Sequence, residues 1–190
     1  LVEAFQRMVY HQMSKRGRQL SPNELIKILR ERIFGVDING AAVRVAAFSL
    51  YLALLDLMEP SDIRQHRLPL LLYEPDREDN DNGTNLFEAN SFWLTPAECL
   101  TLTKRLQQKR YAGRARDEQV VRWPQLPLGG RKFDLVIGNP PWGEPEDSEE
   151  GSRPALWCEA FGLPVGDKEL SQCFIWRARS LLASGGETGV

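Results

Sequence analysis

Four consecutive residues, Asn139-Pro140-Pro141-Trp142, carry groups that suit recognition of a flat ring bearing an amine. The Asn139 side chain presents a carbonyl oxygen, and Pro140 fixes its own φ and pushes Asn139 into an extended conformation. Two carbonyl acceptors held in fixed directions are complementary to an amino group with two hydrogens. Trp142 adds a face on which a nucleobase can stack, a contact worth about 1–3 kcal/mol. The motif contains no general base, so it predicts attack by an amine that is not first deprotonated.

A second polar residue is expected near this motif. The run before Asn139, residues 133–138, is apolar without alternation and predicts a central, buried parallel strand. Residues 33–38 predict a short buried strand that reaches Asp37. Because ligands of parallel sheets bind beyond the carboxyl ends of the strands, we expect Asp37 and Asn139 to mark a ligand site. The structural alternatives are a rigid turn after the strand, with Trp142 covering an edge of the core, and a solvated strand-end acid or helix cap at Asp37.

The stretch FDLVIGNPPW, residues 133–142, resembles the catalytic motif of S-adenosylmethionine-dependent amino-group methyltransferases, above all the DNA N6-adenine methyltransferases. The resemblance implies that the Asn139 carboxamide and the Pro140 carbonyl accept hydrogen bonds from adenine N6, with Pro141 in the next matching position. It also implies that Trp142 stacks on an adenine flipped out of double-stranded DNA. Trp in this place is similar to the large restriction–modification and phage-defence methylases, whereas many relatives have Tyr or Phe.

Other segments agree with this resemblance. Residues 33–39 are similar to the second cofactor motif, which implies that Asp37 binds the ribose hydroxyls of S-adenosylmethionine and that Ile38 lies against its adenine. Asn90-Ser91 weakly matches a position that contacts the cofactor adenine. Residues 181–186 resemble the LL-x-x-GG that closes the next helix of the family.

The resemblance also implies a missing part. In the family a Gly-rich cofactor loop precedes a helix like the one that begins at Leu1. We therefore expect residues 1–190 to be a partial methyltransferase catalytic domain, truncated at both ends, that lacks the first strand and this loop. The remainder of a larger polypeptide is then a partner of the chain, and residues 1–190 alone are expected to bind S-adenosylmethionine poorly and to be inactive.

Helical and strand patterns alternate along the chain, which predicts an α/β fold. The expected architecture is a Rossmann-like methyltransferase sheet, mostly parallel, with helices on both faces. Ser21 and Thr95 each begin a capping box with a glutamate three residues later, and Asn39 is placed to cap a long helix. The predicted helices span residues 1–14, 22–30, 40–57, 95–111 and 168–182, and the predicted strands span 33–38, 68–72, 84–88, 133–138 and the residues after the Ser184-Gly185-Gly186 turn.

Composition limits the other possibilities. The net charge of −2 excludes a globally basic nucleic-acid binder, although residues 104–116 are locally basic and predict either a solvated surface or a polyanion contact. The 3 cysteines share no CxxC spacing and there are only 2 histidines, which argues against a metal site. No apolar run approaches the roughly 20 residues of a membrane helix, so we expect a cytoplasmic protein without a membrane partner.

Two alternative functions stay open at this point. One is another NPP-type N-methyltransferase that acts on protein glutamine or RNA guanine; such enzymes are compact and often carry Tyr after the prolines. The other is a non-catalytic nucleic-acid-binding remnant, which the missing Gly-rich loop allows. The long insert of about 100 residues between Asp37 and Asn139 favours the DNA enzyme.

Overall fold

The computed structural model describes residues 1–73, 84–109, 123–141, 148–166 and 169–189. The chain divides into two compact units, Leu1–Ala89 and Asn90–Val190. Seven helices and four strands lie in the described residues, and the strands form two parallel pairs, β1 with β2 and β3 with β4. The predicted mixed α/β class with parallel strands is confirmed at this level. One continuous Rossmann-like sheet with helices on both faces stays a prediction, as does a single catalytic domain over residues 1–190.

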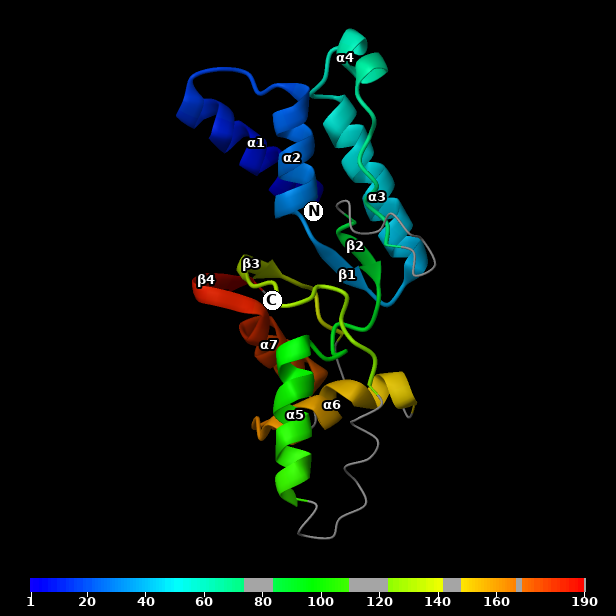
Figure 1. Ribbon diagram of the computed structural model, residues 1–190, viewed down its shortest axis with the longest axis vertical. Helices are drawn as coiled ribbons and strands as arrows, with labels where there is room; N and C mark the ends of the chain where they lie inside the picture. The colour runs from blue at the N-terminus through cyan, green and yellow to red at the C-terminus, as the bar shows by residue number, and fades with distance from the viewer. Residues whose placement is uncertain (74–83, 110–122, 142–147, 167–168, 190) are drawn as a thin grey trace. The chain divides into compact units, whose positions relative to one another are not determined.

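The first unit combines helices with a parallel strand pair (Figure 1). Its elements are α1 (Val2–Arg16), α2 (Pro22–Arg32), β1 (Gly35–Asp37), α3 (Gly40–Leu55), α4 (Pro60–Gln65) and β2 (Leu86–Glu88). The three longer helices pack around one apolar core, to which Phe5, Leu29 and Leu50 contribute fully buried side chains. Burial of such side chains is the main source of stability for helices of this length.

The helix starts of the first unit follow the predicted capping chemistry. Ser21 accepts from the Glu24 amide, the Glu24 carboxylate accepts from the Ser21 amide at 2.8 Å, and Pro22 occupies the first helical position. Asn39 caps α3 by accepting from the amides of Ala41 and Ala42, at 2.9 and 3.2 Å. These bonds satisfy amides that the helices cannot satisfy themselves.

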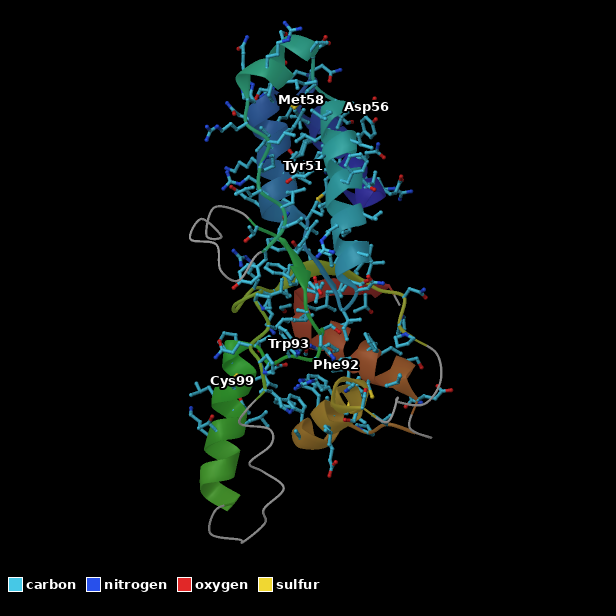
Figure 2. The ribbon with its side chains drawn as sticks, turned by 90° about the vertical axis from the view of Figure 1, so that its right-hand side faces the viewer. Tyr51, Asp56, Met58, Phe92, Trp93 and Cys99 are labelled. Atoms are coloured by element: carbon cyan, nitrogen blue, oxygen red, sulfur yellow. The ribbon has the colours of Figure 1, made fainter. Side chains whose placement is uncertain are left out.

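The first unit differs from the predictions in two details. Residues 68–72 do not form a strand; only Leu72 makes an isolated parallel bridge, to Leu86. The Tyr51 hydroxyl, labelled in Figure 2, fixes this segment against α3, since it donates to the Pro69 carbonyl at 2.7 Å. Helix α4, which was not predicted, begins at Pro60, and proline is well suited to the first helical position.

The second unit contains α5 (Pro96–Lys109), β3 (Phe133–Ile137), α6 (Glu149–Phe161), α7 (Leu170–Leu181) and β4 (Leu182–Gly189) (Figure 1). A separate core joins α5, α6 and α7 to the segment before α5. Its buried members are Phe92, Leu94, Leu102, Trp123, Trp157, Cys158 and Cys173. The predicted end of the helix that begins after Thr95, near residue 111, lies outside the described residues.

Three expectations for the second unit needed correction. Helix α6 lies between the predicted strand 133–138 and the predicted helix 168–182, where no element was predicted; the interior Pro154 hides it in the sequence, although Ser148 accepts from the Gly151 amide as an N-cap. Helix α7 begins at Leu170, after Glu169 as its N-cap position, whereas the predicted start at residue 168 lies outside the described residues. The predicted turn at Ser184-Gly185-Gly186 falls inside β4, which runs through these residues with Gly185 at φ +85°.

Strand β3 also differs from the central buried strand that its apolar sequence predicts. The side chains of Leu135 and Ile137 are 47% and 68% exposed. In the described residues β3 pairs on one side only, with β4, so its apolar residues are not enclosed as they are in a central strand. The pairing is irregular near Phe133, where two residues of β3 span the same length as five residues of β4.

Candidate functional site

Asp37 is the last residue of β1, as the cofactor-motif interpretation requires, and its side chain is exposed. Its Oδ1 accepts a hydrogen bond from the Asn39 amide at 2.8 Å, which closes a tight turn between the strand and α3. The other carboxylate oxygen, Oδ2, has no partner in the part of the chain that the structure describes. Asp37 can therefore hold its turn and still accept a hydrogen bond from a ligand hydroxyl.

Ile38 presents an apolar surface beside this carboxylate. Its side chain is 62% exposed, although isoleucine is among the residues most often buried. Asn39, which follows it, accepts from two amides at the start of α3 through its side-chain oxygen, so the helix cap proposed as an alternative role for Asp37 belongs to Asn39. Exposure of Ile38 next to a free carboxylate oxygen suits a ligand with an apolar ring and a hydroxyl group.

Glu88 is a second acid at this strand end, and it was not among the predicted site residues. It pairs in register with Asp37 at the end of β2. Its carboxylate lies over the Cα of Gly40, where a β-carbon would come within 2.0 Å of Oε2, and it is 4.0 Å from Arg44. The signal was present in the sequence, because Glu88 ends a predicted strand just as Asp37 does.

Asn90 and Ser91 lie in a turn at the start of the second unit. Asn90 is 8% exposed, its Oδ1 accepts from the Phe92 amide at 2.9 Å, and its carbonyl accepts from the Trp93 amide at 2.9 Å. Ser91 is half-buried. Asn90 therefore shapes the turn, and a direct contact from Asn90 or Ser91 to a cofactor stays a prediction.

The turn is held by Arg177 of α7, a residue that the sequence reasoning missed. Its guanidinium donates to the carbonyls of Ser91 and Trp93 at 2.5 and 2.6 Å, and it is 2% exposed. A signal did exist: Arg177 lies on the same helical face as Leu170, Cys173 and Leu181, so the apolar stripe of α7 includes one arginine.

Asn139 and its prolines follow directly on β3. The β3–β4 ladder continues to Gly138, whose amide donates to the Gly189 carbonyl at 2.9 Å, so the backbone is held up to the residue before Asn139. Asn139 is exposed, and its carboxamide has no hydrogen-bond partner within the described ranges. Pro140 is buried and Pro141 is exposed, while Trp142 lies outside the described residues. An unpaired carboxamide is thus presented from a fixed strand end.

A shallow groove between α1 and α3 lies away from the end of β1. It has a volume of about 510 Å³ and its lining is partly apolar; the residues are Val2, Gln6, Ser49, Leu52, Ala53 and Asp56, the last of which is labelled in Figure 2. These α3 residues lie more than two helical turns beyond the end of β1. We therefore do not include the groove in the candidate site.

Three other observations on the described residues bear on function. Lys104 is exposed on α5, while most of the basic segment 104–116 lies outside the described side chains. No helix in the described ranges is both long enough and apolar enough to span a membrane. Nor do these ranges contain a cluster of three or more His, Cys, Asp or Glu side chains suited to a metal ion.

Comparison with known proteins gives one family. No curated protein and no solved structure matches the chain. Residues 31–190 match the model of the Eco57I restriction-modification methylase family. This match begins just before β1 and includes every candidate residue from Asp37 to Trp142. The chain therefore belongs to the Eco57I restriction-modification methylase family.

Proposed function

We propose that this protein transfers a methyl group from S-adenosylmethionine to the N6 amine of an adenine flipped out of double-stranded DNA. Methyl transfer in restriction–modification is what the family match supports. The choice of an exocyclic amine as the acceptor depends on one observation: an exposed Asn139 carboxamide without a partner in the described residues, followed at once by a buried proline. Cytosine carries the same kind of exocyclic amine, but the resemblance of FDLVIGNPPW is greatest to the adenine enzymes.

The Asn139 oxygen and the Pro140 carbonyl accept hydrogen bonds from the two N6 hydrogens. These bonds favour a nitrogen lone pair that is localised on N6, and they stabilise the positive charge that develops there as the nitrogen attacks. The motif contains no side chain that can remove a proton beforehand. The new C–N bond therefore forms as the methyl–sulfur bond breaks, and N6 then loses its proton to solvent. Trp142 stacks on the flipped base and compensates for part of its lost stacking in the duplex.

The residues at the end of β1 fit the cofactor. S-adenosylmethionine, when bound, supplies the electrophilic methyl group. Asp37 Oδ2 is available to accept from a ribose hydroxyl, and the exposed Ile38 side chain can cover one face of the cofactor adenine. Ser91 is half-buried in a turn that Arg177 holds, and its proposed polar contact with the cofactor adenine rests on the family resemblance alone.

A product assay distinguishes this proposal from its alternatives. The full-length protein is incubated with tritiated S-adenosylmethionine and, separately, with duplex DNA, RNA or total protein, and the DNA is digested to nucleosides for mass spectrometry. We expect label in DNA, as N6-methyladenine. Label in protein glutamine or RNA guanine would establish the alternative enzyme class. N4-methylcytosine in the DNA digest would refute adenine as the methylated base. DNA binding without label in any substrate would indicate a non-catalytic remnant.

A further inference from the structure

Arg177 occupies a position in the second unit that packing alone does not explain. Its side chain is 2% exposed and lies with its guanidinium carbon 5.1 Å from the centroid of the Trp157 ring. Burial lowers the pKa of Arg177, while the neighbouring Glu98 carboxylate opposes this effect, and an arginine stays charged in either case. A buried charge is costly unless it is paired, so the partners of Arg177 determine what it contributes.

Those partners belong to three separate elements. The Arg177 Nη1 group donates to Glu98 Oε1 of α5 at 2.5 Å and to Ser180 Oγ of α7 at 3.3 Å. The Nε and Nη2 groups donate to the carbonyls of Ser91 and Trp93, at 2.5 and 2.6 Å. One planar side chain thus joins α7, the start of α5 and two peptide groups of the turn between Asn90 and Leu94.

The two peptide groups are the informative part of this arrangement. Because the Ser91 and Trp93 carbonyls both accept from the guanidinium, the Ser91–Phe92 and Trp93–Leu94 peptide groups have fixed orientations. Phe92 is fully buried against Trp157 and Phe174, with ring centroids 5.7 and 4.8 Å away. Figure 2 shows Phe92 and Trp93 in the segment that leads to α5, which carries Cys99. The direction in which the Ser91 side chain points therefore depends on the hydrogen bonds from the Arg177 guanidinium to these two carbonyls.

We propose that Arg177 is a positioning residue for the cofactor, which acts by holding the Asn90–Trp93 turn in the conformation that binds the adenine of S-adenosylmethionine. This inference rests on the proposed function, in particular on the contact from Asn90-Ser91 to the cofactor. Lysine cannot replace arginine in this role. It carries the charge to Glu98, but a single ammonium group does not reproduce a planar fork directed at two carbonyls and a carboxylate.

The test uses the full-length protein with Arg177→Lys. Arg179→Lys is the matched control, since Arg179 is two residues along the same helix, exposed, and packed by a cation–π contact on Trp176 at 5.8 Å. Dissociation constants for S-adenosylmethionine are measured by calorimetry, and KM and kcat by tritiated methyl transfer. We expect R177K to raise the Kd and KM for the cofactor by about tenfold or more, the scale of losing a hydrogen bond to a charged group. The kcat at saturating cofactor and the KM for DNA should stay within about twofold, and R179K should match the wild type.

A purely structural role predicts a different result. In that case R177K lowers the melting temperature while the folded fraction binds the cofactor with unchanged Kd, and this outcome would overturn the inference. If R177K does not fold, Glu98→Gln decides the matter, because the glutamine oxygen keeps the capping box with Thr95, while an NH2 group replaces the oxygen that accepts from Arg177. A raised cofactor Kd in E98Q with unchanged kcat supports the inference, and an unchanged Kd refutes it.

The inference and the proposed function fail in distinguishable ways. A wild-type protein that neither binds S-adenosylmethionine nor transfers a methyl group refutes the proposed function. A wild-type protein that does both, with an R177K variant of equal cofactor affinity, refutes only the role of Arg177.

Discussion

The side-chain amide of Asn85 donates a hydrogen bond to the carbonyl oxygen of Leu29 at 2.7 Å, although the two residues are 56 positions apart in the chain. The same nitrogen donates to the Ile33 carbonyl at 2.5 Å. Leu29 and Ile33 lie at the carboxyl end of α2, where helix carbonyls lack internal partners. Asn85 is fully buried and directly precedes β2, so one amide group connects the end of a helix to the strand that pairs with β1.

We expect Asn85→Ala to destabilise the first unit by about 2–4 kcal/mol, because two buried carbonyls lose their donor and a small cavity forms. Asn85→Asp should cost at least as much, since it replaces the donor with an acceptor of the same size. Urea unfolding followed by circular dichroism measures both. The control is Asn23→Ala on the exposed surface of α2, expected within about 0.5 kcal/mol of the wild type. An N85A variant as stable as N23A would contradict the role of this amide.

Asn139→Ala is expected to lower methyl transfer by about 100-fold or more, because it removes one of two acceptors that stabilise charge on the attacking nitrogen. Its melting temperature and its affinity for S-adenosylmethionine should match those of the wild type, since the Asn139 side chain is exposed and has no partner in the described ranges. Tritiated transfer, calorimetry and thermal unfolding give the three values, with N23A as the matched asparagine control. Transfer near the wild-type rate in N139A would exclude the mechanism.

Asp37→Asn separates the two tasks of Asp37. Asparagine retains an oxygen that can accept from the Asn39 amide, so the turn before α3 should persist and the melting temperature should change little. The charge that accepts from a ribose hydroxyl is lost, which should raise the KM for S-adenosylmethionine by about 10-fold or more with a small effect on kcat. Steady-state kinetics at saturating DNA provide the measurement. An unchanged KM would show that the residue is only a structural turn acid.

Glu24 should make the stability of the first unit dependent on acid. Its pKa lies well below the ordinary value of 4.5, mainly because Arg18 donates a hydrogen bond to its carboxylate and also because the Ser21 amide does so. A depressed folded-state pKa means that the stabilisation is present above about pH 4.5 and is lost as the pH falls further. Glu24→Gln keeps the capping box without a titrating group. We therefore expect the urea midpoint of the wild type to exceed that of E24Q at pH 7. The difference between the two midpoints should shrink between pH 5 and pH 3. A difference that does not change with pH would contradict a stabilising role of the Glu24 carboxylate.

The local features that the sequence predicted well depend on short-range chemistry. The capping boxes at Ser21 and Thr95 and the cap at Asn39 use groups within three residues of each other, so residue types alone determine them. The end of β1 at Asp37 was predicted for a similar reason, because the apolar run stops and a cap follows. The family resemblance rested on ten contiguous residues, FDLVIGNPPW, and the family match includes them.

The features that were missed depend on long-range contacts. Arg177 bonds to Ser91 from 86 positions away, and nothing in the local sequence says which carbonyls a buried arginine will meet. The exposure of Ile137 depends on how many strands flank β3, which its own composition cannot reveal. Helix α6 was missed because Pro154 is normally a helix breaker, and its effect is offset here by packing of Trp157 and Cys158 in the second core.

The parallel pairing of β1 with β2 has a consequence for the order in which the first unit folds. Gly35 is paired with Leu86, so the intervening chain, which includes α3 and α4, must close into a loop before the first ladder bond can form. Such closure is entropically unfavourable and is compensated only when many contacts form together, whereas helices acquire their bonds locally and early. The last step is then the docking of β2, together with its Asn85 amide, onto a preassembled group of α1, α2 and α3. If β2 binds the helices less tightly, the folding rate stays nearly unchanged and unfolding becomes faster. Asn85 therefore determines the lifetime of the native state more than the rate at which it forms.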